Sequence, residues 1–281
     1  MGKMEIDKCE SEDQKLDTLL LCGGYATRLS PISDFMPKAL LPIGGRPIIS
    51  HILDEIKYLT DRIVIATNEK FSDQFLYWLK NQDIQNLPNK ISLIIEPTTN
   101  EGEKFGIVKA VSHAIEKENL HRNLLIFSTD VFREFSIKPF VEHFKKYKRP
   151  AILLRDLSEY GVLPGSEIKL QDFIYLNRKL EISRKRTLTC GVVACPAHVT
   201  KSVLEYSKIT QNPDSLSSFL RLFGNTNDVD LITSSGKSYD IGTIEGYKTI
   251  FDVYEDKQLN LQSLKRTGNA NDIKNHTKLK K

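Results

Sequence analysis

The stretch "LLLCGGYATRLSPISDFMPKALLPIGGRPII", residues 19–49, says most about the fold and the site of this chain. An apolar run ends at Gly23 and Gly24, and two cations follow, Arg28 and Lys38. Glycines at the end of a strand let backbone N–H groups approach a phosphate, because no Cβ stands in the way. Arginine binds phosphate oxygens as a fork and lysine as a point charge. The stretch therefore indicates an anion-binding loop after a buried strand, although a Gly-Gly turn alone can also simply connect two elements.

Apolar, β-branched runs alternate with helical patterns over the first part of the chain. The runs predict buried strands at 17–22, 62–67, 91–96, 123–129 and 150–156. Apolar residues at helical spacing predict helices at 47–59, 71–82, 104–118 and 136–148. Such alternation is typical of a doubly wound α/β sheet, in which ligands bind at the carboxyl ends of the strands.

After residue 157 the alternation becomes less regular, and we expect α+β elements that extend the same sheet. The expected elements are strands at 173–176 and 187–196, helices near 198–208 and 215–224, and a closing segment at 230–254. No internal repeat or Gly/Ser linker divides the chain. We therefore predict a single domain at 17–256, after a charged extension at 1–16 and before a basic tail at 257–281 that we expect to be disordered.

The charge distribution argues against a nucleic-acid-binding protein. The net charge is +4, but the tail 257–281 holds seven Lys and Arg against Asp272 alone, so the preceding 256 residues carry −2. No segment is apolar enough for a signal core or a membrane span. The cysteines show no metal-binding spacing, and Cys22 and Cys190 lie in apolar runs, which predicts buried thiols and a cytoplasmic protein.

Residues 23–49 closely resemble the signature of sugar-1-phosphate nucleotidyltransferases, GGxGTRLxPLTxxxPKPLLPVxGxPxI. Four further segments resemble family landmarks in the family's order: "LLIFSTD", "DLSEYGVL", "TCGVVACP" and "YDIGTIEGY". The resemblance covers residue 17 to about 250. It implies an α/β fold of the nucleotide-diphospho-sugar transferase type, with a Rossmann-like, doubly wound, mixed and mostly parallel sheet.

The resemblance also implies the roles of individual residues. The glycine loop would wrap the nucleoside triphosphate, Arg28 and Lys38 would bind its phosphates, and Asp130 and Asp240 would hold Mg²⁺. Asp130 would thereby be catalytic together with the two cations. Further contacts are implied for the nucleotide at Leu21, Gly23, Gly24, Thr27, Glu96 and Gly102, and for the sugar phosphate at Gly161, Lys179 and Gly191.

The sequence departs from the family pattern at several positions. Ala26 replaces the usual glycine of the loop, and Lys104 stands where the family's "GTAGA" or "GLAQA" segment has a small residue. Lys179 is preceded by Arg178 instead of the glutamate of "EKP", which suggests a more acidic substrate or a different alcohol phosphate. Glu96 before Pro97 can only accept hydrogen bonds when ionised, so it suits guanine or cytosine and favours GTP or CTP; alternatively it caps the next element.

The chemistry can be argued from the residue types as well. The second pKa of a phosphate monoester is near ~6, so the attacking oxygen is ionised at neutral pH and needs no general base. The reaction needs alignment of two anions and neutralisation of charge on the leaving pyrophosphate, which cations and Mg²⁺ supply. Three alternatives stay open: a non-catalytic regulatory subunit of the same fold, a cytidylyltransferase for an alcohol phosphate such as phosphocholine, and structural turn or cap roles for the two aspartates. The sequence is compatible with an oligomer.

Overall fold

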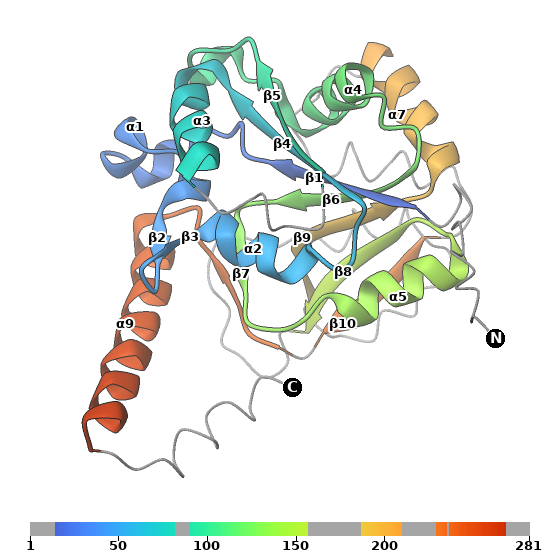
Figure 1. Cartoon of the computed structure of the whole chain (residues 1–281). Coiled ribbons are helices and arrows are strands. Elements are labelled where there is room, and N and C mark those ends of the chain that lie inside the picture. Colours follow the sequence, from blue (N-terminus) through green and yellow to red (C-terminus); the bar gives the residue numbers. More distant parts are fainter. Residues whose placement is uncertain (1–14, 82–89, 157–186, 210–228, 235, 268–281) are drawn as a thin grey trace, which may run out of the picture.

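The computed structural model describes residues 15–81, 90–156, 187–209, 229–234 and 236–267, with the backbone alone described at 156, 187–188 and 256–267. Its centre is a seven-stranded sheet in the order β10-β8-β9-β6-β1-β4-β5 (Figure 1). The strands are β1 (Leu16–Leu21), β4 (Arg62–Asn68), β5 (Lys90–Glu96), β6 (Asn123–Ser128), β8 (Ala151–Asp156), β9 (Thr187–Cys195) and β10 (Asp230–Ser234). All neighbours pair in parallel except β9, which is antiparallel to both β6 and β8. The predicted mixed, mostly parallel sheet is confirmed.

Helices cover both faces of this sheet. They are α2 (Ile48–Ile56), α3 (Ser72–Asn81), α4 (Gly106–Glu118), α5 (Lys138–Tyr147), α7 (Ala197–Ile209) and α9 (Ile244–Thr267). Residues of α2, α3, α5 and α9 join one apolar cluster, and residues of α4 and α7 join a second cluster on the other face. In Figure 1, α4 and α7 lie side by side at the upper right of the view. The three layers follow from strands that are apolar on both faces and must be covered twice.

Alternation along β1 shows how one strand supplies both cores. Leu16 and Leu20 are fully buried in the cluster with α2 and α3, whereas Leu19 is fully buried in the cluster with α4. Successive side chains of a strand point to opposite faces, so a run of leucines reaches both layers. Thr18, which faces the first cluster, donates to Thr60 Oγ1 at 2.9 Å and is thereby satisfied in the interior.

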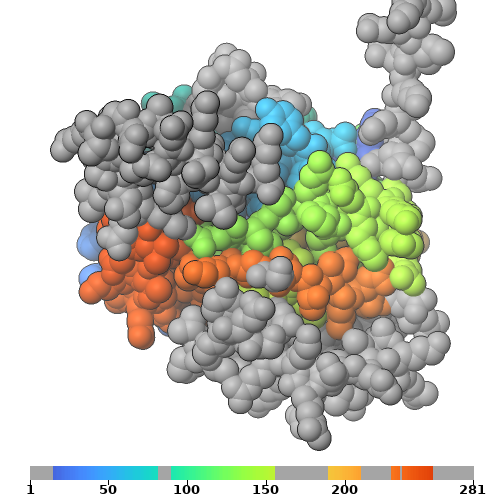
Figure 2. All heavy atoms as spheres, turned by 90° about the horizontal axis from the view of Figure 1, so that it is seen from below, coloured from blue at the N-terminus to red at the C-terminus, as the bar shows by residue number. Residues whose placement is uncertain are grey.

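Two small antiparallel ladders lie beside the main sheet. One pairs β2 (Pro42–Ile43) with β3 (Arg46–Pro47), and the other pairs β7 (Val131–Arg133) with β11 (Ser238–Asp240). Figure 2 shows the molecule from below, where β10 and β11 (orange) run next to the yellow-green segment that contains β7 and α5. The second ladder joins two parts of the chain that are more than a hundred residues apart. Short helices complete the described elements: η2 (Thr27–Leu29), α1 (Ile32–Phe35), η3 (Lys38–Leu40), η4 (Glu69–Phe71) and η6 (Glu101–Glu103).

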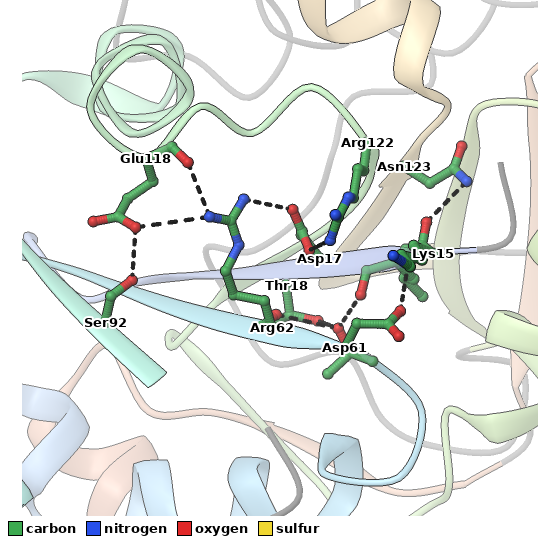
Figure 3. Close-up of polar contacts among 11 residues, drawn as sticks. Lys15, Asp17, Thr18, Asp61, Arg62, Ser92, Glu118, Arg122 and Asn123 are labelled. Atoms are coloured by element: carbon green, nitrogen blue, oxygen red, sulfur yellow. Dashed lines mark hydrogen bonds and ion pairs between the residues drawn. The ribbon is translucent and has the colours of Figure 1, made fainter. Parts of the chain in front are cut away.

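The amino ends of the central strands are held by a polar network at the edge remote from the glycine loop (Figure 3). Arg62 donates to Asp17 Oδ2 at 2.7 Å and to the carbonyl of Glu118 at 2.9 Å. Ser92 Oγ donates to Glu118 Oε2 at 3.0 Å. Asp17 is fully buried, so the guanidinium compensates a charge that would otherwise be costly in the interior. The network joins β1, β4, β5 and the end of α4, and we interpret it as structural.

The structure departs from the sequence predictions at the carboxyl end. Helix α9 continues to Thr267, so the backbone is helical over residues 257–267 of the predicted tail. This stretch contains no Gly or Pro, and Gly268 directly after it is a typical helix stop, which is a signal that the prediction missed. Residues 268–281, the strand predicted at 173–176 and the helix predicted at 215–224 lie outside the described residues. Within the described residues, no helix has both the length and the apolar character needed to cross a membrane.

Candidate functional site

A cavity of about 620 Å³ opens at the carboxyl ends of the central strands. Of the residues predicted to act in the site, eight lie on its wall: Leu21, Gly24, Thr27, Arg28, Lys38, Asp130, Gly191 and Asp240. Predicted contacts that do not lie on its wall are Gly23, Glu96 and Gly102. Gly161, Lys179 and its neighbour Arg178 lie outside the described residues. The position matches the strand-end location that the fold class predicts.

The glycine loop is held by two side chains, one at the end of β4 and one directly after β6. Asn68 Nδ2 donates to the carbonyl of Gly23 at 2.9 Å, and Thr129 Oγ1 donates to the carbonyl of Leu21 at 3.0 Å. A Cβ on Gly24 would meet nothing within 4 Å, so this glycine leaves open space above the backbone. Ala26 has φ +50°, so the position does use the left-handed conformation in which alanine is strained by about 1 kcal/mol. The loop is therefore preorganised, with open space for a ligand at Gly24.

Cys22 lies at the base of this loop but is not a nucleophile. Its side chain is buried, and burial raises the pKa of the thiol to about 12. A thiol rather than a thiolate is therefore present at neutral pH, and a thiol is a poor nucleophile. Cys190 is buried as well, and the same cause raises its pKa to about 11. Both cysteines pack as small apolar residues, as predicted.

Lys38 is the central cation of the pocket. It begins η3 after Pro37 and is only 7% exposed, although it carries a charge. Its ammonium donates to Asp130 Oδ1. Burial lowers the pKa of Lys38 to about 8, while the carboxylate of Asp240 opposes that shift. A buried ammonium that faces carboxylates indicates a site in which positive and negative side chains lie next to one another.

The two predicted metal aspartates are brought together by the β7–β11 ladder. Asp130 lies in the turn between β6 and β7, directly before Val131, and Asp240 ends β11 opposite Val131. The backbone N–H of Ile241 donates to the carbonyl of Asp130 at 2.9 Å, which ties the two segments at this point. The carboxylate of Asp130 is 62% exposed and therefore open to a ligand. Hard carboxylate oxygens are the donors that Mg²⁺ prefers, so the residues present fit this ion.

The turn after Asp240 explains why two glycines follow it. Asp240 Oδ1 accepts a hydrogen bond from the N–H of Gly242 at 2.7 Å. A Cβ on Gly246 would lie 1.9 Å from the carbonyl oxygen of Asp240, so only glycine fits there. The first turn of α9 therefore packs against the backbone of Asp240 and fixes its direction. No cluster of three or more metal-ligating side chains occurs among the described residues, so any ion here would rely on few protein ligands.

Glu96 lies behind the glycine loop and not on the pocket wall. Its side chain is 3% exposed, and its carboxylate oxygens lie 2.7 and 2.8 Å from where a Cβ of Gly23 would be. A Cβ at position 23 would therefore force the nearly buried carboxylate to shift. Burial raises the pKa of Glu96 to about 7, which Lys109 partly counteracts. The alternative that Glu96 caps the next element is wrong, because Asn100 Oδ1 accepts from the N–H of Gly102 and caps η6.

The segment after Glu96 contributes neighbours of Gly102, but not Gly102 itself, to the cavity wall. Gly102 is exposed in η6, and the neighbouring wall residues are Glu101, Lys104 and Ile107. Ile107 follows Gly106, which has φ +69° at the start of α4. Lys104, which departs from the family pattern, donates to Glu101 Oε1 at 2.7 Å.

The far end of the pocket is built by β9, β8 and β11. Gly191 has φ +69°, and a Cβ there would lie 3.2 Å from the Cβ of Ser128. Sequence analysis missed two polar residues at this end, Thr189 of β9 and Arg155 of β8. Arg155 is 8% exposed and bonds to Ser238 of β11 through Nη1. Periodicity alone could not reveal these residues, since each interrupts an apolar strand without any neighbouring motif.

Comparisons with known proteins agree with this geometry. A sequence model of the family described as Nucleotidyl transferase matches residues 17–174. The chain is 24% identical over 196 residues to the bifunctional protein GlmU of Methanocaldococcus jannaschii, covering 70% of this chain and 43% of that protein. It is 26% identical over 159 residues to mannose-1-phosphate guanylyltransferase 1 of Arabidopsis thaliana, covering 54% of this chain and 42% of that protein. The chain thus spans less than half the length of these relatives.

Solved structures share the fold at low sequence identity. A UDP-glucose pyrophosphorylase in complex with UDP-glucose superposes with a TM-score of 0.65 at 18% identity, covering 86% of this chain and 99% of that one. A UTP-bound UGPase from Acinetobacter baumannii gives a TM-score of 0.62 at 16% identity, covering 88% of this chain and 99% of that one. At this identity the likeness shows the fold alone, which confirms the predicted fold class.

Proposed function

Because the chain belongs to the nucleotidyl transferase family, we propose that it transfers a nucleoside monophosphate from an NTP to a sugar-1-phosphate and releases pyrophosphate. The observation that carries this proposal is the contact between Lys38 and Asp130 on the wall of the cavity, with Asp240 beside them on the β7–β11 ladder. Cations for phosphates and carboxylates for a metal ion are thereby gathered at one strand edge. This combination is what the transfer between two anions requires.

The reaction forms one bond and breaks one. An oxygen of the sugar-1-phosphate attacks the α-phosphorus of the NTP, and the bond from this phosphorus to the β-phosphate's bridging oxygen breaks, so pyrophosphate leaves with its electron pair. The attacking oxygen is already ionised, because the second pKa of a phosphate monoester is near ~6. This chain therefore has to align the two phosphates rather than remove a proton.

Residues at different positions in the cavity would contribute differently to the alignment of the two phosphates. The backbone from Gly24 to Thr27 and the exposed guanidinium of Arg28 line the nucleotide end, where they would hold the β- and γ-phosphates. Lys38 lies at the aspartates and would neutralise charge at the reacting phosphates. Asp130 and Asp240 would hold Mg²⁺, which would neutralise charge that builds up on the leaving pyrophosphate.

We propose GTP or CTP as the nucleotide on the basis of Glu96. The carboxyl group is nearly buried behind Gly23 and does not line the cavity, so this choice requires the base to reach Glu96 past the glycine loop. When ionised it only accepts hydrogen bonds, and guanine and cytosine present more donors than uracil or thymine. A wild-type preference for UTP or dTTP over GTP and CTP would contradict this choice.

Pyrophosphate release with Mg²⁺ tests the proposal directly. The assay uses four NTPs against glucose-, mannose-, galactose- and heptose-1-phosphate, with phosphocholine as the competing acceptor. Asp130→Asn should abolish turnover, whereas Asp252→Asn, the same change at an exposed position of α9, should leave it unchanged. Nucleotide binding without turnover of any acceptor would instead support a regulatory subunit, and turnover of phosphocholine alone would support the alcohol-phosphate alternative.

A further inference from the structure

Glu101 carries a carboxylate on the cavity wall that the proposed reaction does not use. It lies in η6, between β5 and α4, and its side chain is 42% exposed. Glu96, in contrast, is 3% exposed behind Gly23 and is not a wall residue. A ligand in the cavity therefore meets the carboxylate of Glu101 directly, without any displacement of the glycine loop.

The order of strands places Glu101 where a nucleobase would lie. In the sheet, β4 and β5 are on one side of β1, whereas β6, with Asp130 after it, is on the other side. A nucleotide whose phosphates lie between the glycine loop and Asp130 directs its base away from β6, toward the ends of β4 and β5. Neighbouring strands are about 4.8 Å apart, so the segment after β5 lies roughly 10 Å from β1, a distance that a nucleoside can span.

The wall at this end combines apolar surface with one ion pair. Leu21 and Ile107 pack against the apolar cluster of α4 and α7 and also line the cavity, so they offer aliphatic surface to the faces of a ring. Tyr25 lines the cavity too, but its hydroxyl already donates to Thr98 Oγ1 at 3.1 Å. The carboxylate of Glu101 is therefore the hydrogen-bond acceptor that the wall after β5 offers to the edge of a base.

Glu101 is held in place by bonds within its own segment. Lys104 Nζ donates to Glu101 Oε1 at 2.7 Å, and Asn100 Oδ1 caps η6 by accepting from the N–H of Gly102 at 3.1 Å. Within the part of the chain that the structure describes, Oε2 of Glu101 accepts no hydrogen bond. Lys104 thus orients the carboxylate through one oxygen. The other oxygen can accept from a ligand, because acceptance requires a lone pair and not an uncompensated charge.

A carboxylate in this position distinguishes bases by the donors on their edges. Guanine presents N1–H and N2–H side by side, so two parallel hydrogen bonds can reach one carboxylate. Adenine and cytosine present an amino group as the donor of this edge. The N3–H of uracil or thymine lies between two carbonyl oxygens, which a carboxylate repels. Guanine therefore fits an acceptor-only group best.

We propose that Glu101 is a specificity residue for guanine nucleotides and accepts hydrogen bonds from N1–H and N2–H of the base. The inference rests on the proposed function and deepens it: it narrows GTP or CTP to GTP, and it places recognition of the base at Glu101 instead of Glu96. A hydrogen bond to a charged group changes affinity by roughly 10-fold or more, so the loss of one donor is measurable.

Equilibrium binding of nucleotides to the full chain, measured by isothermal titration calorimetry with Mg²⁺, tests the inference without any acceptor. GTP is compared with CTP, UTP, ATP and ITP, since the base of ITP differs from guanine only by lacking the 2-amino group. The wild type should bind GTP roughly 10-fold or more tightly than ITP. Glu101→Gln should bring the GTP-to-ITP affinity ratio to one or below, because its amide presents a donor where the carboxylate accepts. Glu116→Gln, at an exposed position of α4, should leave both affinities unchanged.

Three results would overturn the inference, and they differ from one another. Equal affinity of the wild type for GTP and ITP would show that the 2-amino group is not recognised. An equal loss for every nucleotide in Glu101→Gln would show that the residue only shapes η6. Loss of the difference between GTP and ITP in Glu96→Gln, but not in Glu101→Gln, would place recognition of the base behind the glycine loop.

The same measurements separate this inference from the proposed function. Guanine-selective binding without turnover of any sugar-1-phosphate would refute the transfer reaction and leave the role of Glu101 intact. Turnover without guanine selectivity would do the reverse. Binding of none of the five nucleotides would refute both.

Discussion

The buried carboxyl group of Glu96 makes stability depend on pH, and Glu96→Gln isolates this effect. Burial raises the pKa of Glu96 from 4.5 to about 7 in the folded chain, whereas the unfolded chain keeps the ordinary value. Between these two pH values the folded chain binds the proton and the unfolded chain does not. The free energy of unfolding therefore falls as the pH rises through this window, and the loss is complete above pH 7.

The size of the effect follows from the pKa difference. A difference of about 2.5 units corresponds to roughly 3 kcal/mol, because each unit is worth about 1.4 kcal/mol. Glutamine has nearly the same shape and is neutral at every pH. We therefore expect Glu96→Gln to match the wild type near pH 4.5 and to be more stable by up to roughly 3 kcal/mol at pH 8.

Urea denaturation followed by circular dichroism at pH 5, 6, 7 and 8 measures this difference. Glu69→Gln is the matched control, because Glu69 is exposed and the same change there should give no pH-dependent gain. A gain for Glu96→Gln that is constant across the pH range would refute the reasoning, since a constant gain cannot come from a shifted pKa. A glutamine variant less stable than the wild type at pH 8 would refute it as well.

Three further predictions concern glycines and one buried arginine. Gly23→Ala should destabilise the protein by about 2 kcal/mol, because its Cβ would meet the Glu96 carboxylate at 2.7 Å. Gly24→Ala, which adds a Cβ in open space, should keep the melting temperature of the wild type and raise KM for the NTP. Equal melting temperatures of the two variants would contradict this contrast. Gly246→Ala should displace the backbone of Asp240, so loss of turnover at unchanged NTP affinity is expected, and an active variant would count against the close packing. Arg133→Met removes a 2.7 Å bond to a buried carbonyl of β9 and should cost about 2 kcal/mol in a denaturation assay, which an unchanged midpoint would exclude.

Local patterns in the sequence predicted most of the fold. The five strands predicted in the first 156 residues all occur, each within about two residues of its expected ends. Short apolar, β-branched runs can be recognised from the local sequence alone. The loop with its two cations could be predicted for a similar reason, because Arg28 and Lys38 follow a strand within one continuous segment. Even the end of α9, which the tail prediction misplaced, was marked in the sequence by Gly268.

The tertiary structure decided what depends on distant neighbours. Asp130 and Asp240 are 110 residues apart, and the ladder of β7 with β11 brings them to one wall. The resemblance predicted their roles, but only this pairing shows them beside Lys38. The same reason explains the burial of Glu96 behind Gly23, which arises where the loop after β1 packs on the end of β5.

Arg155 shows most clearly what the sequence alone could not predict. In the sequence it is one arginine at the end of an apolar run, with nothing nearby to indicate a ligand. Its place on the cavity wall follows from the order of strands in the sheet and from its bonds to Ser238, which is 83 residues away. The sequence by itself thus determined the strands, the loop and the kinds of charge in the site. The pairing of remote strands decided which of those charges share one cavity, because side chains far apart in the chain meet only when the backbone hydrogen bonds of the sheet bring them together.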